Sequence, residues 1–254
     1  MAASTIRVIA GRNNQQVSSL TGVNYGNAQT IYPHPGYDDT TLVNDISIIQ
    51  LDRPLTIDGI TTRLAYVENG TIPINYQGTV SGWGYTDTQQ STVQANLRKV
   101  TVPVVSDSIC NGSPYHFGMS SPNQICAGDG NNHDACVGDS GGPLLRVLNT
   151  TTNDYVVFGI VSYGGPTTGC GGINRGVYTS TSYYLQSFIK TYAPNVQTNA
   201  YSSSSPLSPS VNSPTKTPMT SPHTSNGASS QITCVILLII CILFSSNYIN
   251  SFME

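Results

Sequence analysis

The chain has 254 residues and a formal net charge of -3, and only 9% of its residues are Asp, Glu, Lys or Arg. No basic block or stripe is present, so the sequence lacks the electrostatic signature of a nucleic-acid-binding protein. The length is enough for a sizeable core, and β proteins of this size commonly form one domain.

Short apolar runs with a period of two dominate residues 5–194. They are rich in β-branched or aromatic residues and are bounded by Gly, Pro or Asn, which is typical of strands. In chain order they are TIRVIAG, AQTIYPH, DISIIQL, GTVSGWG, LRKVTVPVV, GGPLLRVL and YVVFGIVSYG. Because no strictly alternating strand–helix units occur, we predict an all-β fold with two layers or a barrel.

One stretch near the end of this region has the period of a helix. Leu185, Phe188, Ile189 and Tyr192 fall on one helical face, with Ser182 as the candidate cap and Pro194 as the stop. The all-β fold is therefore expected to end in a single helix.

The composition changes after Pro194, and we place the end of the folded domain at residue 196. Residues 197–230 are almost entirely small and polar, so they cannot bury enough apolar surface to offset their chain entropy. A Ser/Thr/Pro-rich segment of this kind is typical of a stalk, and such stalks are often O-glycosylated.

Residues 231–254 form a hydrophobic tail whose apolar core runs from Ile232 to Phe244. That core is short against the ~20 residues of a membrane-spanning helix. No Lys or Arg follows it, so the usual charge signal for orientation is absent. Small residues precede it, as in a GPI signal, although the polar spacer is shorter than usual. A GPI signal and a single spanning helix both stay open, and a merely buried helix is the third alternative.

The segment DACVGDSGGPLL, from Asp134 to Leu145, places Ser140 between an aspartate and two glycines. A serine hydroxyl needs a base to become a good nucleophile. The motif also fits the G-x-S-x-G turn of α/β-hydrolases, which requires a following helix and a later histidine. Pro143 follows almost at once, and the one later histidine, His223, lies in the stalk-like segment, so this alternative is disfavoured.

Five motifs together resemble the trypsin-like serine protease family over residues 5–194. They are DACVGDSGGPL, NDISIIQL (Asn44–Leu51), GTVSGWG (Gly78–Gly84), VSYGGPTTGC (Val161–Cys170) and GVYTSTS (Gly176–Ser182). They occur in the family's order and at plausible spacings. The resemblance implies a double antiparallel β-barrel with a C-terminal helix and an active site between the barrels.

The resemblance also implies roles for three residues in catalysis. Ser140 is expected to be the nucleophile, and the backbone N–H groups of Gly138 and Ser140 would form the oxyanion hole. Asp45 is expected to be the buried acid that orients the catalytic histidine. The alternative for Asp45 is an aspartate at a strand start that accepts local backbone hydrogen bonds.

A specificity pocket follows from the same resemblance. Asp134 would lie at its base and favour Arg or Lys before the cleaved bond. Ser162, Tyr163, Gly164 and Gly176 are the further substrate-binding residues, and the two glycines leave room for a long side chain. Tyr163 stands where the family usually has Trp. The alternative for Asp134 is a solvated acid in the loop GNNHDAC.

Four cysteines lie in the protease-like region and by themselves allow three pairings. The resemblance selects Cys110–Cys126 and Cys136–Cys170, and paired cysteines imply an oxidising compartment. Three sequons begin at Asn69, Asn111 and Asn149, consistent with secretion and N-glycosylation. No cofactor or metal is expected, because GRNNQQVSSLTG lacks the carboxylates of the family's calcium loop.

None of the four histidines fits the catalytic position. The family's histidine precedes the aspartate within a T-A-A-H-C-like motif, and only His34 precedes Asp45. The segment IYPHPGYDD around His34 resembles a surface loop, and His133 neighbours the pocket carboxylate. His116 and His223 come later in the chain. We therefore expect no histidine of this chain to serve Ser140.

The start MAASTIRVIAG resembles the family segment that follows the missing histidine motif. No signal peptide and no I-V-G-G-like start precede it, and about three strands of the first barrel are missing on the family pattern. We therefore expect residues 1–254 to be an N-terminally incomplete protease that is inactive as written. The alternative is a catalytically dead homologue that acts as a binding module.

These observations predict a serine endopeptidase that cleaves protein or peptide substrates after Arg or Lys. Protein inhibitors are expected as further partners, and nucleic acid is not. The enzyme is expected at the extracellular face of a membrane, reached by the secretory pathway and attached through its C-terminal tail.

Overall fold

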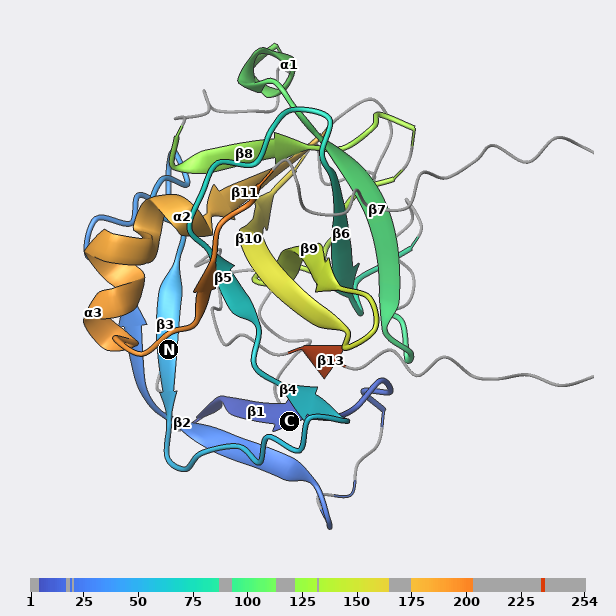
Figure 1. The fold of residues 1–254 in the computed structure, drawn as a ribbon, viewed down its shortest axis with the longest axis vertical. Helices are drawn as coiled ribbons and strands as arrows, with labels where there is room; N and C mark the ends of the chain where they lie inside the picture. The colour runs from blue at the N-terminus through green and yellow to red at the C-terminus, as the bar shows by residue number, and fades with distance from the viewer. Residues whose placement is uncertain are drawn as a thin grey trace, which may run out of the picture.

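The computed structural model describes residues 5–16, 19, 21–86, 93–112, 122–131, 133–164, 175–202 and 234–235 (Figure 1). Its strands are β1 (Arg7–Ala10), β2 (Asn24–Pro33), β3 (Ser47–Leu51), β4 (Thr62–Arg63), β5 (Tyr66–Glu68), β6 (Gln77–Gly82), β7 (Arg98–Val105), β8 (Gln124–Ala127), β9 (Pro143–Asn149), β10 (Asp154–Tyr163), β11 (Gly176–Ser180), β12 (Thr198–Asn199) and β13 (Cys234–Val235). The helical elements are α1 (Asp107–Asn111), α2 (Thr181–Tyr184), the π-helical η2 (Leu185–Ile189) and α3 (Lys190–Tyr192).

Six strands close into an antiparallel barrel. Their order is β11-β8-β7-β6-β9-β10, and β10 pairs back with β11 (Figure 1). In β7 the alternation of the sequence is reflected in burial, because Val102 and Val104 are buried while Thr101 is exposed. The barrel core contains Val80, Leu144 and Phe158, which are almost inaccessible to solvent. The predicted all-β fold with a C-terminal helix is therefore confirmed.

A separate antiparallel sheet contains the N-terminal strands in the order β1-β2-β3. Arg7 opposes Asn27 at one side of β2, and Tyr32 opposes Ile48 at the other. This sheet lies at the lower left of Figure 1, beside the barrel. Where two barrels were expected with the first incomplete, the described residues place a three-stranded sheet in the first position.

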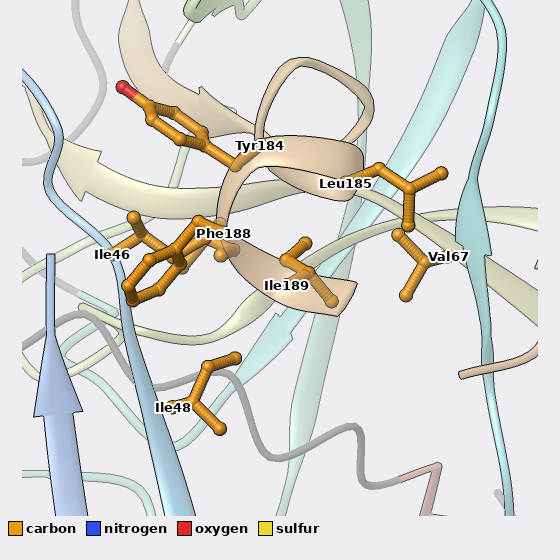
Figure 2. Close-up of a cluster of buried hydrophobic side chains, with 8 residues drawn as sticks. Ile46, Ile48, Val67, Tyr184, Leu185, Phe188 and Ile189 are labelled. Carbon is orange, nitrogen blue, oxygen red and sulfur yellow. The ribbon is translucent and has the colours of Figure 1, made fainter. Parts of the chain in front are cut away.

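The helical elements α2, η2 and α3 run without interruption and pack between the two parts of the fold. Leu185, Phe188 and Ile189 are buried, as the helical period predicts. Figure 2 shows them between Ile46 and Ile48, at the start of β3, and Val67 of β5. Burying this face stabilises the N-terminal sheet against the barrel.

Two details of the predicted helix differ in the structure. The first helical residue is Thr181, so Ser180 occupies the N-cap and the expected cap, Ser182, lies inside the helix. The prediction of the cap was therefore wrong by two residues. Tyr192 is 40% exposed and stacks on Tyr32, with ring centroids 4.3 Å apart, rather than entering the core.

The chain returns to the barrel sheet after the helix. Strand β5 pairs in parallel with β10, and β12 pairs in parallel with β5. Neither short strand was predicted, because two or three residues give no usable periodicity. Strand β12 lies just past the predicted domain boundary at residue 196.

Residues 203–230 of the predicted stalk, which was placed at residues 197–230, and nearly all of the hydrophobic tail lie outside the described residues. Cys234 and Val235 are the exception, and their backbone pairs in parallel with β4. In the part of the chain that the structure describes, no helix has the length and apolar character needed to cross a bilayer.

Candidate active site

Asp45 lies two residues before β3 and is only 1% exposed. Its Oδ2 accepts a hydrogen bond of 2.6 Å from the Ser162 hydroxyl on β10. Its carbonyl oxygen accepts another of 2.8 Å from the Thr179 hydroxyl on β11. The carboxylate therefore accepts a hydrogen bond from a strand that is far away in the sequence.

Ser140 is exposed on a tight turn between Cys136 and β9. Within this turn the amide of Asp139 donates to the carbonyl of Cys136, and the amide of Gly142 donates to the carbonyl of Asp139. Gly138 and Gly141 have φ angles of 96° and 80°, which favour glycine. The glycines of the motif are therefore required by the backbone path around Ser140.

Strand β10 brings this turn and Asp45 to the same place. Val161 accepts a hydrogen bond from the Gly141 amide and donates one to the Gly142 carbonyl, both 2.9 Å long. The next residue, Ser162, donates its hydroxyl hydrogen bond to Asp45. Because consecutive Cα atoms are about 3.8 Å apart, the serine turn and the buried acid are anchored side by side.

Asp134, Gly164, Gly176 and Tyr178 form a second group. The Asp134 Oδ1 accepts hydrogen bonds from the Ala135 amide at 2.8 Å and from the Tyr178 hydroxyl at 3.3 Å. A Cβ at Gly176 would lie 2.7 Å from this Oδ1, and one at Gly164 would lie 3.9 Å from Oδ2. A side chain at Gly176 would therefore displace the carboxylate.

Tyr178 was not predicted as a site residue. It is fully buried, two positions after Gly176 on β11, and its hydroxyl is directed at Asp134. Residues two apart on a strand point to the same side, so the pair Gly176 and Tyr178 carried a signal for this contact.

Burial raises the pKa of Asp134 to about 7, although its two hydrogen bonds act in the opposite direction. The nearby carboxylates of Asp139 and Asp129 raise it further. An opposite charge brought close to such a group would favour its ionised form. A cation placed beside Asp134 would therefore lower the pKa of this carboxyl.

Asp139 precedes Ser140 and is enclosed by the GWG motif. Its Oδ1 accepts a hydrogen bond of 2.8 Å from the Gly84 amide, and its Oδ2 accepts one of 3.0 Å from the Cys136 amide. A Cβ at Gly82 would overlap this Oδ1, so the position has no room for a side chain. Burial raises the pKa of this carboxyl as well. Among the described residues, Asp139 has no ion-pair partner.

The two described histidines are engaged elsewhere. The His34 ring contacts Tyr184 and Phe188, and its Nδ1 accepts a hydrogen bond of 3.1 Å from the Gly36 amide. Burial lowers its pKa. Nδ1 of His133, whose side chain is exposed, lies 2.6 Å from Asp129 Oδ2.

Among the described residues, no hydrogen bond joins His34 or His133 to Ser140 or Asp45. His116 and His223 lie outside the described residues. The base for Ser140 is therefore not found among the histidines that the structure places.

The predicted disulfide Cys110–Cys126 is confirmed, and it joins α1 to β8. Cys136 is also disulfide-bonded, and its predicted partner Cys170 lies outside the described residues. The three sequon asparagines Asn69, Asn111 and Asn149 are exposed.

The two remaining predicted pocket residues differ in burial. Ser162 is 1% exposed, whereas Tyr163 is half-buried. No group of three or more His, Cys, Asp or Glu side chains suited to a metal ion occurs in the described ranges.

Comparison with known proteins gives a consistent result. The family model described as Trypsin matches residues 2–188. The chain is 36% identical to trypsin from Sus scrofa over 198 residues, which cover 76% of the chain and 78% of that protein. It is 35% identical to trypsin eta from Drosophila melanogaster over 185 residues, covering 72% and 65%.

Vitamin K-dependent protein C from Oryctolagus cuniculus is a longer relative. It is 34% identical over 170 residues, which cover 63% of this chain and 35% of protein C. The chain thus spans about a third of this relative and just under two thirds of trypsin eta.

Proposed function

Because the chain belongs to the trypsin family of serine proteases, we propose that it represents an endopeptidase that cleaves after Arg or Lys. One observation carries the specificity: the Asp134 carboxylate, which is only partly exposed, faces two residues without side chains, Gly164 and Gly176. Burial raises the pKa of this acid to about 7, so an arginine or lysine side chain would both pair with it and stabilise its charge.

The catalytic roles follow from the geometry around Ser140. The exposed Ser140 hydroxyl would attack the carbonyl carbon of the substrate, and its proton would pass to a base. The amides of Gly138 and Ser140 would donate to the oxygen on which negative charge develops. Asp45, fixed by Ser162, would orient that base and stabilise its charged form.

We propose that neither His34 nor His133 is this base. Each is engaged with other residues, and proton transfer requires the base to lie within hydrogen-bond reach of the nucleophile. Residues 1–254 by themselves are therefore proposed to hydrolyse peptide bonds poorly. The same observation favours a second candidate function, a non-catalytic homologue that binds cationic side chains. The coding sequence upstream of Met1 discriminates the two, since only the protease requires a histidine motif there.

We also propose that the protein acts outside the cell and is attached to a membrane. The Cys110–Cys126 disulfide supports an oxidising compartment, and the exposed asparagines of the three sequons support passage through the secretory pathway. The attachment rests on the composition of residues 231–254.

Binding of an aromatic amidine tests the specificity without requiring catalysis. The chain of residues 1–254 is titrated with p-aminobenzamidine, whose amidinium mimics an arginine side chain. We expect saturable binding that Asp134→Ser abolishes and Asp39→Ser, a change at an exposed acid, leaves intact. Equal binding by the chain and by Asp134→Ser would refute the pocket assignment.

A further inference from the structure

Glu68 of β5 and Arg146 of β9 form a buried ion pair. Their exposed fractions are 1% and 2%, and Arg146 Nε lies 2.5 Å from Glu68 Oε2. Removing two charges from water is costly unless hydrogen bonds satisfy their remaining donors and acceptors. The other hydrogen-bond partners of Glu68 and Arg146 therefore determine how stable this buried ion pair is.

Several of those partners come from residues 197–202, here termed the exit segment. Arg146 Nη2 donates to both the carbonyl oxygen and the Oδ1 of Asn199, at 3.0 and 2.5 Å. The Tyr201 amide donates to Glu68 Oε1 at 2.8 Å, alongside the amides of Asn69 and Gly70. The exit segment thus satisfies both members of the ion pair.

The backbone and one aromatic ring hold the same segment. The Val67 amide donates to the Gln197 carbonyl at 2.8 Å, and the strand that follows α3 runs beside β5 (Figure 1). The Tyr201 ring meets the Tyr76 ring edge-on at 5.3 Å, and Tyr76 in turn packs on the buried Phe158. The contacts on both sides of Asn199 are therefore specific.

We propose that the exit segment stabilises the turn that carries Ser140, and we call this role a latch. Its hydrogen bonds to Glu68 and Arg146 fix the position of β9, and β9 in turn fixes the backbone of the turn. Strand β9 begins one residue after Gly142, and Arg146 opposes Val156 in the β9–β10 pairing. Further along β10, backbone hydrogen bonds join Val161 to Gly141 and Gly142. When the exit segment detaches, Arg146 Nη2 loses its two hydrogen-bond acceptors on Asn199. Strand β9 and the turn that precedes it then become more mobile.

Amide hydrogen exchange on the full chain tests the latch. Asn199→Ala removes one acceptor of Arg146, whereas the control Gln197→Ala changes an exposed side chain of the same segment. Relative to the control, we expect exchange to accelerate at least about tenfold at the amides of Tyr201, Gly141 and Val161 in Asn199→Ala. Unchanged exchange at Gly141 and Val161 would overturn the latch.

A second variant covers the case in which Asn199→Ala does not fold. Tyr201→Ala removes the contact with Tyr76 and leaves both members of the ion pair intact. Tyr201→Ala should accelerate exchange at the amides of Gly141 and Val161, and unchanged exchange at these two amides would also overturn the latch. Because the readout is amide protection rather than turnover, the result does not depend on whether the chain is an active protease.

Discussion

The Ser162 hydroxyl on β10 donates a hydrogen bond of 2.6 Å to the buried Asp45 carboxylate, which lies 117 residues earlier in the chain. Removing the donor weakens the solvation of a buried charge, so Ser162→Ala should lower the free energy of unfolding by about 1–3 kcal/mol. Urea unfolding followed by circular dichroism measures the loss. The control Ser187→Ala, at an exposed helical position, should have little effect, and equal stabilities would show that this bond contributes nothing.

The affinity of p-aminobenzamidine should depend on the ionisation of Asp134. A protonated Asp134 cannot pair with the amidinium, and burial raises the pKa of this group to about 7. Binding should therefore strengthen about a hundredfold as the pH rises from about 5 to about 8. Fluorescence titrations at each pH measure this change.

In Asp134→Asn the same titrations should show weak binding at every pH, because an amide does not ionise in this range. The exposed-site variant Asp39→Asn should retain the pH dependence of the parent chain. A pH-independent affinity in the parent would contradict the role of Asp134.

The raised pKa of Asp134 also makes a prediction for stability. The pKa of Asp134 in the folded state, about 7, exceeds its ordinary value of 3.8, so between these two pH values the folded state binds more protons than the unfolded state. The free energy of unfolding should therefore fall as pH rises through this window. Asp134→Asn removes this cost and should stabilise the chain near pH 8 by up to about 4 kcal/mol.

At about pH 4 the parent chain and Asp134→Asn should have similar free energies of unfolding, because Asp134 is then protonated in the folded state. Thermal unfolding at both pH values measures the difference. If Asp134→Asn were less stable than the parent chain near pH 8, the ionised Asp134 carboxylate would not destabilise the folded state.

Non-reducing peptide mapping should find Cys110 joined to Cys126 and Cys136 joined to Cys170. The first bridge is present in the structure, and the second is the pairing that the family resemblance implies. Replacing the first pair by Cys110→Ala and Cys126→Ala should cost about 3 kcal/mol, because the bridge closes a loop of 16 residues in the unfolded chain. A peptide linking Cys136 to Cys234 or Cys241 would contradict the second pairing.

Attachment to a membrane should depend on the hydrophobic tail. Full-length protein expressed in secretory cells should fractionate with membranes, and deletion of Ile232–Glu254 should release it into the medium. Release of the intact form by phosphatidylinositol-specific phospholipase C would identify a GPI anchor, whereas resistance would favour a spanning helix. Full-length protein that is secreted with its tail intact would refute both forms of attachment.

The amino-acid sequence alone predicted the strand-rich fold, the C-terminal helix and a reactive serine at Ser140, whereas Asp45 and Asp134 were predicted through the family resemblance. These features have local signals: a period of two along strands, a helical period at Leu185 and Phe188, and glycines that a tight turn requires. The motif around Ser140 is contiguous, so a nucleophilic serine could be predicted without coordinates. The disulfide Cys110–Cys126 needed the family resemblance as well, because spacing by itself allowed three pairings.

Only the tertiary structure decided how these segments meet. The bond from Ser162 to Asp45, the Tyr178 contact with Asp134 and the Glu68–Arg146 pair join residues 117, 44 and 78 positions apart. A long-range hydrogen bond depends on which backbones the topology places side by side, and no local period records that. Strand β12 is the clearest example, since its short polar sequence forms a strand only because β5, Glu68 and Arg146 provide partners for its backbone and for Asn199.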